Sequence, residues 1–465
     1  MDVLLLTAVN PFSYQIIPDL GLMYLASSLR NAGLEVSLKD LRKNRWNYGR
    51  VGEYVRKERP MIVGIKCYSY EVSRVKVMTE VIRDSYPRAL IVIGGPHPSM
   101  DPAGTFQAFP CADYAFLGES EWSFRDFALW VKAGGRGSPP ESVPGIAYRT
   151  ASGVAVRDPV FEPDLDKLPM PAWDLLPPTD YPDEATGIFA PGFPAPPMML
   201  SRGCPFNCSY CGAKYVMGER IRYRSAANVL EEISFLEREY RVKNFTFVDD
   251  NFTCNREIAL ELFHALANRA KRIAFTFPNG MRPSTLDAEL LRAMEAAGCY
   301  SLSLGIESGS DQTLSRMNKK QTRAEIVKVV DLIRNTTSIK VTGFFILGYP
   351  GETLEDVKDT IRFAVELPIH HPHFCLFSPL PGTPVDHELR RQGLIPAQGL
   401  HPEQLTYDRP SLPLHGLPPR RLILLHQYAY LRFYLTPWRM RNLLQEIRSP
   451  GNLWVIMRRA IKLLG

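Results

Sequence analysis

The sequence contains no apolar run of about 18 or more residues, the length that a membrane-spanning helix needs. A spanning helix is therefore not expected. The first ten residues, M-D-V-L-L-L-T-A-V-N, lack the basic segment that precedes the apolar core of a secretory signal peptide. We interpret them as a first β-strand, and we expect a cytoplasmic protein. With 465 residues, 45% of them apolar, the chain can build the cores of two or three domains.

Cysteine is sparse except in one loop. Five of the eight cysteines occur singly in apolar segments, where a cysteine usually behaves as a small buried hydrophobic residue. The other three, Cys204, Cys208 and Cys211, have the spacing C-x3-C-x2-C within a Gly/Pro turn. Because the chain shows no export signal, this spacing indicates metal ligation rather than a disulfide framework.

Acidic residues are nearly absent from the end of the chain. Residues 420–465 contain nine Lys or Arg and a single acid, Glu446, so they sum to +8, whereas the whole chain has a formal charge of +6. Within this region, segments 438–448 and 453–464 alternate basic and bulky apolar residues. They predict amphipathic helices that either cap the preceding domain, which we favour, or lie on an anionic membrane surface. No nucleic-acid partner is expected, because no aromatic stacking platform accompanies the charge.

Strand-like and helix-like patterns alternate over residues 1–138. This alternation predicts an α/β domain with an open, mostly parallel, Rossmann-like sheet, whose ligands lie at the carboxyl ends of the strands. Strands are expected at 3–9, 35–38, 61–66, 90–94 and 114–117, and helices at 20–31, 71–86 and after Glu119.

Proline marks the connection to a second domain. Eleven of the 39 prolines lie in residues 159–197, which excludes a packed β/α unit there. We therefore expect residues 139–197 to form a largely irregular connector between two domains.

A second β/α series occupies residues 198–384. Six strands are too few for a complete TIM barrel, so the series predicts a partial (β/α)6 barrel, followed by a small helical region at 385–465. In such barrels the functional groups lie on loops after the strands, and the three-cysteine loop follows the first strand. The six strands are expected to begin near Met198, Phe245, Ala274, Tyr300, Lys340 and His373.

Three thiols in one loop suit an iron–sulfur cluster. A structural zinc site closes with four ligands. A [4Fe-4S] cluster has four irons that each take one outside ligand, so three thiolates leave one iron open for a substrate or cofactor. The alternative is a zinc site completed by Cys254 or a histidine. We interpret the tract His370–His373 as solvated loop residues at the opposite end of the barrel.

The loop C-P-F-N-C-S-Y-C, from Cys204 to Cys211, resembles the signature of the radical S-adenosylmethionine (radical SAM) enzymes. Three further stretches resemble motifs of that superfamily in the same order: F-V-D-D-N-F at 247–252, S-L-G-I-E-S-G-S at 303–310 and F-F-I-L-G-Y-P-G-E-T at 344–353. The resemblance implies that SAM chelates the open iron and is cleaved by one electron to methionine and a 5′-deoxyadenosyl radical.

The same resemblance implies roles for individual residues. Cys204, Cys208 and Cys211 would hold the cluster. Tyr210 would approach the adenine, and Asp249 or Asp250 the methionine amino group, although the glycines usual in that motif are absent. A tight turn explains a glycine after a strand equally well. The remaining SAM contacts implied are Glu307 and Ser308 after the fourth strand and Ile346 and Gly348 near the adenine.

The first domain resembles the cobalamin-binding domain fused ahead of the barrel in the class B radical SAM methyltransferases and related enzymes. The matching stretches are residues 18–33, 63–70, V-I-G-G-P-H-P at 92–98 and F-L-G-E-S-E at 116–121, and with the barrel motifs the likeness covers about residues 1–383. Glycines that end a strand let the backbone approach a bulky planar ligand. The cobalamin contacts expected are Thr7, Ser69, Gly94, Gly95, Pro96, His97, Gly118 and Glu119.

The chain departs from one cobalamin pattern, because the D-x-H-x-x-G motif that supplies a cobalt ligand is absent. His97 lies in a Pro-flanked turn, where we do not expect it to bind cobalt. The resemblance then implies cobalamin with no protein ligand on its lower face. The alternative is a domain that keeps the fold without binding cobalamin.

These resemblances imply an enzyme that methylates an unactivated carbon of a small molecule. One SAM would methylate cobalamin, a second would yield the radical, and the substrate radical would take the methyl group. The expected partners are the substrate, which would be hydrophobic if the membrane interpretation holds, and an electron donor such as flavodoxin or ferredoxin. The alternatives are a radical cyclase, rearranging or oxidising enzyme and, outside enzymes, a zinc- or corrinoid-binding protein.

Overall fold

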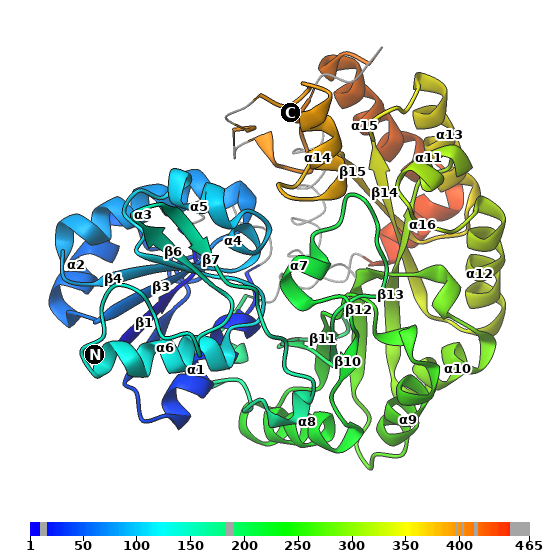
Figure 1. Cartoon of the computed structure of the whole chain (residues 1–465). Helices are drawn as coiled ribbons and strands as arrows, with labels where there is room; N and C mark the ends of the chain where they lie inside the picture. Colours follow the sequence, from blue (N-terminus) through cyan, green and yellow to red (C-terminus); the bar gives the residue numbers. More distant parts are fainter. Residues whose placement is uncertain (10–15, 183–189, 397–398, 402–403, 413–416, 447–465) are drawn as a thin grey trace.

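The computed structural model describes all residues except 10–15, 183–189, 397–398, 402–403, 413–416 and 447–465. Two α/β domains lie side by side, the first in blue and cyan and the second in green and yellow, and the C-terminal helices pack on the second (Figure 1). One hydrophobic cluster joins them, because it includes Met23 of the first domain, Trp173 of the connector and Ile233 of the barrel. The domains therefore share a core.

A seven-stranded sheet of order β2-β1-β3-β4-β5-β6-β7 forms the first domain. Strands β1 to β5 are parallel, and helices on both faces bury the apolar central strands, as is usual for parallel sheets. All five predicted strands and all three predicted helices are present, while helices α2, α4 and α5 were not predicted. The elements are β1 Val3–Leu6, α1 Leu20–Asn31, β2 Val36–Lys39, α2 Tyr48–Glu58, β3 Ile62–Lys66, α3 Val72–Ser85, β4 Leu90–Gly94, α4 Pro96–Met100, α5 Pro102–Ala108, β5 Tyr114–Phe116 and α6 Glu121–Lys132.

The first domain extends further than predicted. Strands β6 (Ile146–Thr150) and β7 (Gly153–Val156) form an antiparallel hairpin that pairs with β5 and enlarges the first sheet. They lie within residues 139–197, which we expected to be connector, and beyond the expected boundary at 138. The hairpin was missed because its pairing with the edge of β5 depends on a contact between segments about 30 residues apart.

The second domain is an open, six-stranded parallel sheet of order β15-β14-β13-β12-β11-β8. No pairing closes β8 onto β15 in the described residues, so the predicted partial (β/α)6 barrel is confirmed. Helices α8 to α13 cover its outer face (Figure 1). The strands are β8 Pro197–Met198, β11 Asn244–Phe247, β12 Ala274–Met281, β13 Cys299–Glu307, β14 Lys340–Leu347 and β15 His371–Leu376. The helices are α8 Ala226–Tyr240, α9 Arg256–Ala267, α10 Ala288–Ala297, α11 Asp311–Arg316, α12 Arg323–Thr336 and α13 Leu354–Glu366.

Side chains cap the barrel helices at their first turns. Ser225 accepts a hydrogen bond from the Asn228 N–H where α8 begins. Thr322 and Glu325 form a capping box at the start of α12 by exchanging side-chain and backbone hydrogen bonds. These caps fix where α8 and α12 begin, after the loop segments that follow the carboxyl ends of β8 and β13.

The C-terminal region packs on the last barrel strand. It contains α14 (Pro384–Arg391), α15 (Pro419–Tyr434) and α16 (Pro437–Glu446). His426 of α15 lies with Nε2 2.9 Å from the Phe374 carbonyl oxygen of β15, and Arg439, 2% exposed, donates to two carbonyl oxygens of the α13 end. Residues 437–446 therefore cap the barrel, as favoured; segments 447–448 and 453–464 lie outside the described residues.

Two further findings concern this region. In the part of the chain that the structure describes, no helix has both the length and the apolar character needed to cross a membrane. His371, expected in a solvated loop, is buried at the start of β15, with Nδ1 2.8 Å from the Tyr434 hydroxyl. That expectation was wrong for His371, because α15 packs against this strand.

Candidate active site between the two domains

The three cysteines lie on a loop that leaves the barrel between two paired strands. The hairpin of β9 (Ser201–Arg202) and β10 (Arg222–Tyr223) pairs Arg202 with Arg222. Residues 203–221 between them carry the cysteines and the short helix α7 (Ala213–Met217), which lies between the domains in Figure 1. Gly203 opens the loop with φ +95°, and a Cβ there would lie 2.3 Å from the Arg220 carbonyl oxygen, so glycine is required.

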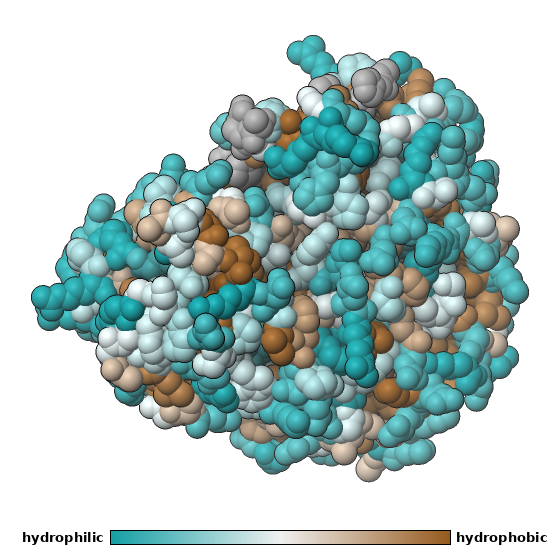
Figure 2. Space-filling view, viewed as in Figure 1, coloured by the Kyte–Doolittle hydropathy of each residue, from teal (hydrophilic) through white to brown (hydrophobic). Residues whose placement is uncertain are grey.

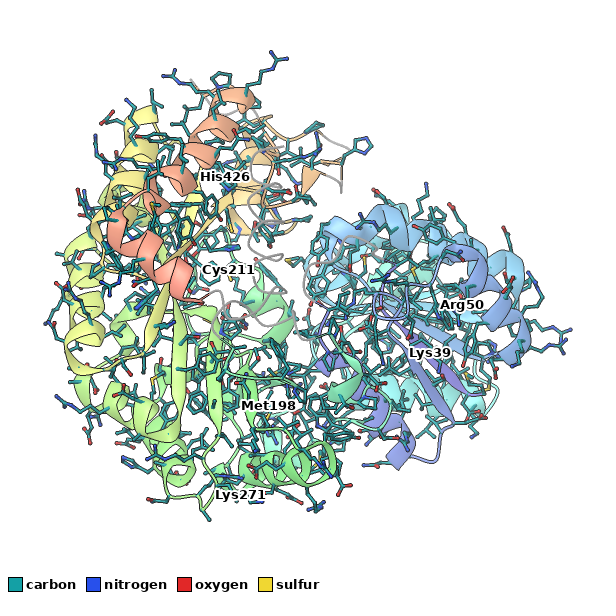
Figure 3. All side chains as sticks on the ribbon, turned by 180° about the vertical axis from the view of Figure 1, so that it is seen from behind. Lys39, Arg50, Met198, Cys211, Lys271 and His426 are labelled. Carbon is teal, nitrogen blue, oxygen red and sulfur yellow. The ribbon has the colours of Figure 1, made fainter. Side chains whose placement is uncertain are left out.

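The three thiols are half-buried and lie close to one another. Burial raises the pKa of Cys211 to about 12 and also raises the pKa of Cys204. Both thiols lie within electrostatic range of Cys208 and Asp250. Three thiolates this close together repel one another unless more positive charge than one lysine compensates them, so the donor set fits a cationic metal cluster. Figure 3 shows Cys211 at the side of the barrel that faces the first domain.

A fourth thiol lies nearby. Cys254, in the turn after β11, is within electrostatic range of Cys204, and burial raises its pKa to about 12. Among the described residues, no group of three or more His, Cys, Asp or Glu side chains is arranged to hold a single metal ion.

Asp249 and Asp250 follow β11 and have different surroundings. Asp249 accepts hydrogen bonds from the N–H groups of Leu200 and Ser201 and from the Ser201 hydroxyl, so it fixes the backbone that leads into the cysteine loop. Asp250 has no hydrogen bond or ion pair to another described residue, and burial raises its pKa to about 6. A half-buried carboxylate without a partner beside the thiols fits a cationic amino group.

Glu307 ends β13 with φ +68° and forms an ion pair with Lys319. The Lys319 Nζ lies 2.7 Å from Glu307 Oε1 and 3.3 Å from the Tyr210 hydroxyl, and the two side chains of the pair are 8% and 10% exposed. Burial lowers the pKa of Lys319, but Glu307 and Cys208 outweigh it and the pKa is raised. Sequence analysis missed Lys319, because it lies 12 residues beyond Glu307 outside any periodic pattern.

Arg282 is a second residue that sequence analysis missed. Its guanidinium carbon lies 4.0 Å from the ring centroid of Phe206, a cation–π contact within the cysteine loop. Arg282 also donates to the carbonyl oxygens of Lys319 and Lys320. It therefore joins the end of β12 to the cysteine loop and to the segment that carries Lys319.

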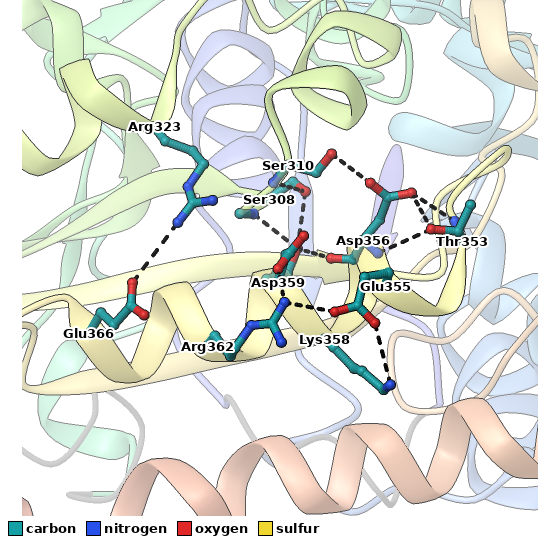
Figure 4. Close-up of polar contacts among 12 residues, drawn as sticks. Ser308, Ser310, Arg323, Thr353, Glu355, Asp356, Lys358, Asp359, Arg362 and Glu366 are labelled. Carbon is teal, nitrogen blue, oxygen red and sulfur yellow. Dashed lines mark hydrogen bonds and ion pairs between the residues drawn. The ribbon is translucent and has the colours of Figure 1, made fainter.

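Ser308 points away from the cysteine loop. Its hydroxyl lies 3.1 Å from Thr360 Oγ1, and the neighbouring Ser310 donates to Asp356 Oδ1 at 2.7 Å; both partners belong to α13 (Figure 4). The Ser308 side chain is fully buried in this contact. If Ser308 contacts SAM as expected, it must do so through its backbone.

Gly348 and Ile346 lie at the carboxyl end of β14. Gly348 has φ +81°, and its N–H donates to Glu352 Oε2 at 2.7 Å, so the turn itself requires the glycine. Ile346 packs in the same apolar cluster as Tyr210. Ile346 and Tyr210 therefore border the same apolar cluster, and their contact with adenine stays a prediction.

The first domain presents an open glycine at the carboxyl edge of its sheet. A Cβ added at Gly94 would meet no other atom within 4 Å. At Gly95, with φ +94°, a Cβ would lie 3.0 Å from Lys66 Cγ and 3.2 Å from the Cys67 carbonyl oxygen, so the backbone requires glycine there. The space at Gly94 fits a bulky ligand that approaches the end of β4.

A buried histidine follows this turn. His97 lies with Nδ1 3.2 Å from the Ser69 hydroxyl, while its Nε2 is buried without a partner among the described residues. Burial lowers the pKa of His97 to about 4, so the ring is neutral at neutral pH. A buried ring nitrogen without a hydrogen-bond partner, three residues from Gly94, can hydrogen-bond to a polar group of a ligand.

Two expected cobalamin contacts have side chains that are engaged elsewhere. The Thr7 hydroxyl donates to Asp40 Oδ1 at 3.1 Å and accepts from the Leu41 N–H at 2.9 Å, so it ties β1 to the end of β2. Glu119 Oε1 lies 2.6 Å from Arg222 Nη2, and its side chain is 5% exposed. We therefore correct the expectation for these two side chains: one stabilises the sheet, and the other contacts the barrel domain.

Pro96 and Gly118 have backbone roles. Pro96 is the first residue of α4, where the missing N–H costs nothing. Gly118, with φ +63°, donates its N–H to Ser99 Oγ at 2.9 Å. Both residues shape the edge of the first sheet next to Gly94 and Gly95.

The carboxyl edges of the two sheets face each other. A Cβ added at Gly212 of the cysteine loop would lie 2.4 Å from Met100 Sδ, and one at Gly382, after β15, would lie 2.2 Å from the Met100 carbonyl oxygen. Helix α4, which begins beside Gly95, therefore contacts the cysteine loop directly. The face in Figure 2 is largely hydrophilic, with small apolar patches near the junction of the domains.

A separate cavity of about 200 Å³ lies away from this site. None of the residues expected to bind cluster, SAM or cobalamin lines it. Its lining residues are Tyr24, Leu165, Leu168, Pro169, Met170, Arg224, Asn228 and Glu231.

Comparison with known families agrees with this geometry. The model of the radical SAM superfamily matches residues 198–364, and the model of the B12 binding domain matches residues 8–128. The first range covers the cysteine loop and the strands from the end of β8 through β14. The second covers the sheet edge that carries Gly94, Gly95 and His97.

Similar proteins extend over nearly the whole chain. The uncharacterised methyltransferase PH0819 of Pyrococcus horikoshii is 30% identical over 421 residues, 90% of this chain and 88% of that protein. The cytidylyl-2-hydroxyethylphosphonate methyltransferase of Streptomyces wedmorensis is 27% identical, covering 86% of this chain and 82% of its own. The radical SAM methyltransferase TsrM from Kitasatospora setae, solved with cobalamin and a [4Fe-4S] cluster, has a TM-score of 0.70 at 23% identity over 86% of this chain and 80% of its own, and shares the fold.

The fold and the site define a two-domain enzyme with an iron–sulfur barrel and a Rossmann-like ligand-binding domain. The chain belongs to the radical SAM superfamily, in the family whose members carry a B12-binding domain ahead of the barrel. The resemblance to radical SAM enzymes with a cobalamin-binding domain, the α/β fold class and the prediction of an enzyme are confirmed. The [4Fe-4S] cluster, SAM and cobalamin expected from the sequence are the cofactors of this family.

Proposed function

We propose that this enzyme transfers a methyl group from SAM, by way of cobalamin, to a carbon of a small-molecule substrate. The observation that carries the proposal is the contact of α4, beside Gly94 and Gly95, with the cysteine loop at Gly212. This contact sets the ligand edges of the two domains against each other, so one substrate can reach both. The two relatives found by sequence, PH0819 and the Streptomyces wedmorensis enzyme, both carry the name methyltransferase.

The proposed reaction consumes two SAM molecules and two electrons. One SAM gives up its methyl group and leaves as S-adenosylhomocysteine. The other gives methionine and 5′-deoxyadenosine, whose new hydrogen comes from the substrate carbon that receives the methyl group. Bound together, the cluster, SAM and cobalamin supply the radical and the methyl group.

The residues of the chain bind and orient these groups in the proposal. Cys204, Cys208 and Cys211 hold the cluster, and Asp250 accepts a hydrogen bond from the amino group of SAM. Lys319, held by Glu307, donates to the SAM carboxylate. Tyr210 and Ile346 pack against the adenine, and the surrounding apolar cluster excludes water.

A labelling experiment tests the proposal without knowledge of the substrate. The anaerobically purified enzyme, supplied with cobalamin and a reductant, is incubated with SAM that carries a trideuterated methyl group. Mass spectrometry should find the label on the corrinoid, and liquid chromatography should find S-adenosylhomocysteine in equal amount. 5′-Deoxyadenosine without label on the corrinoid would refute methyl transfer and favour the cyclising or oxidising alternative.

Lys319 gives a prediction for SAM binding. Lys319→Met removes a charge-assisted hydrogen bond, for which about 1.5–3 kcal/mol is typical, and leaves Glu307 buried without its partner. We expect the dissociation constant of SAM, measured by equilibrium dialysis on the cluster-loaded enzyme, to rise about 10- to 100-fold. Lys320→Met, at an exposed neighbouring lysine, is the control and should bind SAM as the wild type does. If Lys319→Met bound SAM with wild-type affinity, Lys319 would not be part of the SAM site.

The reaction needs electrons from outside the site. We propose a one-electron donor of the flavodoxin or ferredoxin type, because the two electrons must come from another molecule. Reduction of the cluster by a reduced flavodoxin, followed by electron paramagnetic resonance (EPR), tests this: a cluster that stays oxidised would exclude such a donor.

We also propose that the protein is cytoplasmic and that it contacts an anionic membrane surface peripherally. Exposed apolar residues recur along α15 and α16 at helical spacing, and arginines accompany them. Sedimentation with vesicles of anionic lipid should carry the protein down, and vesicles of neutral lipid should not; equal behaviour would refute the contact. The apolar residues are Leu424, Tyr428, Leu431, Leu435 and Trp438, between 43% and 64% exposed.

A further inference from the structure

Four charged side chains are buried together between the two domains. Arg222 lies 2.6 Å from Glu119 Oε1 and 2.8 Å from Glu119 Oε2, and Arg202 lies 2.7 Å from Glu121 Oε1 and 3.5 Å from Glu119 Oε2. The four side chains are only 4% to 8% exposed. We call Glu119, Glu121, Arg202 and Arg222 the interdomain charge cluster. Its acids come from the first domain and its bases from the barrel.

The two arginines stand at the two ends of the cysteine loop. Arg202 on β9 and Arg222 on β10 pair with each other, and the loop 203–221 runs between them. Arg202 is separated from Cys204 only by Gly203. Arg222 also donates to the carbonyl oxygen of Met217 at 2.6 Å, within the loop itself. Both ends of the cysteine loop are therefore fastened to the first domain.

The two glutamates continue toward the glycine edge of the first sheet. Glu119 follows Gly118, whose N–H donates to Ser99 Oγ at 2.9 Å. The Ser99 hydroxyl in turn donates to the Gly95 carbonyl oxygen at 2.8 Å. A continuous path of short polar contacts and adjacent residues thus joins Gly95 to Cys204 through Glu119 and the arginines.

We infer that the interdomain charge cluster is a positioning element that fixes the separation between the cysteine loop and the glycine edge of the first domain. The inference rests on the proposed function, because it gives this separation a purpose: one substrate carbon must reach both the SAM radical and the methyl donor. Buried charges hold one arrangement, since any other leaves a charge without its partner in an apolar setting. These residues act through the groups they position.

A second buried ion pair provides a matched control. Arg224 Nη1 lies 2.6 Å from Glu232 Oε2, with the side chains 7% and 1% exposed, and both residues belong to the barrel domain. Glu232 also accepts from the indole N–H of Trp173. Its loss should destabilise the fold comparably without changing how the cysteine loop faces the first domain.

The test compares Glu119→Gln with Glu232→Gln in the full-length enzyme. Each protein is loaded with cob(II)alamin and a reduced [4Fe-4S] cluster, two paramagnetic centres whose dipolar coupling reports their separation in pulsed EPR. We expect a single narrow distribution of separations for the wild type and for Glu232→Gln. For Glu119→Gln we expect a broader distribution or a shifted mean. A distribution as narrow as that of the wild type, at the same mean, would overturn the inference.

A second measurement needs no cofactor. Hydrogen exchange of the cofactor-free protein should be about tenfold faster in residues 203–221 for Glu119→Gln, which corresponds to local opening made easier by about 1.4 kcal/mol. Glu232→Gln should leave exchange in that loop unchanged. Equal rates in all three proteins would overturn the inference. If the wild type binds no corrinoid, the proposed function fails and this measurement alone decides the inference.

Arg222→Lys serves if Glu119→Gln does not fold. Lysine keeps the charge but cannot span both oxygens of Glu119 and the Met217 carbonyl oxygen together. The same two measurements apply. Wild-type separation and wild-type exchange in Arg222→Lys would refute a positioning role for the arginine.

Discussion

Replacement of Cys204, Cys208 and Cys211 by alanine should remove the iron–sulfur cluster completely. In the proposal each thiolate ligates a different iron, so the loss of three leaves the cluster without a protein ligand. Iron should fall from about four per chain to near zero, and the reductive cleavage of SAM to 5′-deoxyadenosine should stop. Iron and sulfide assays after anaerobic reconstitution, with chromatographic detection of 5′-deoxyadenosine, give the measurement.

Cys254→Ala is the control for this triple variant. Cys254 lies within electrostatic range of Cys204, yet it is not part of the C-x3-C-x2-C loop. We expect it to keep about four irons and normal SAM cleavage. Loss of metal in Cys254→Ala, with zinc and no sulfide in the wild type, would instead support a four-thiol zinc site and refute the cluster.

Gly94→Val should weaken cobalamin binding while the fold and the cluster remain. The new side chain would begin in space where no protein atom lies within 4 Å, and Gly94 is not among the glycines with positive φ, so valine can adopt its backbone. It would then occupy the space that the ligand needs at the end of β4. We expect corrinoid affinity, followed by visible absorption, to fall by about 10- to 100-fold, the cost of overpacking a close-fitting site.

Gly192→Val is the matched control for this variant. Gly192 is exposed, a Cβ there also meets no atom within 4 Å, and its carbonyl oxygen accepts from Asn244 at the amino end of β11. This position lies at the far end of the barrel from the cysteine loop. Gly192→Val should bind corrinoid normally. Normal corrinoid binding in Gly94→Val would show that the ligand does not approach this edge.

Local patterns were sufficient for the architecture. Strand-like apolar runs that alternate with segments of helical spacing located five strands of the first sheet and the six of the barrel. Each strand and each helix buries its apolar residues with its own fixed period, which is visible in the sequence. The expected strand 90–94 coincides with β4, Leu90–Gly94. The hairpin of β6 and β7 was not found, since its pairing with β5 joins segments distant in the sequence.

Neighbouring residues in a motif were harder to assign. Asp249 and Asp250 are adjacent acids that the sequence does not distinguish. In the structure Asp249 accepts hydrogen bonds from the backbone N–H groups of Leu200 and Ser201, whereas Asp250 has no such partner and lies near the thiols. Successive residues after a strand point in different directions, so the backbone decides which carboxylate meets a ligand. Ser308 shows the same effect, because its hydroxyl faces Thr360 of α13.

The sequence alone determined the class of this protein, because three thiols within eight residues and the period of the β/α units are local properties that folding does not change. Only the tertiary structure decided what Glu119 and Lys319 contact. Glu119 meets an arginine 103 residues away, and Lys319 meets Glu307 and Tyr210. A buried charge is stable only beside its partner, and that partner is chosen by how the domains pack rather than by its place in the chain.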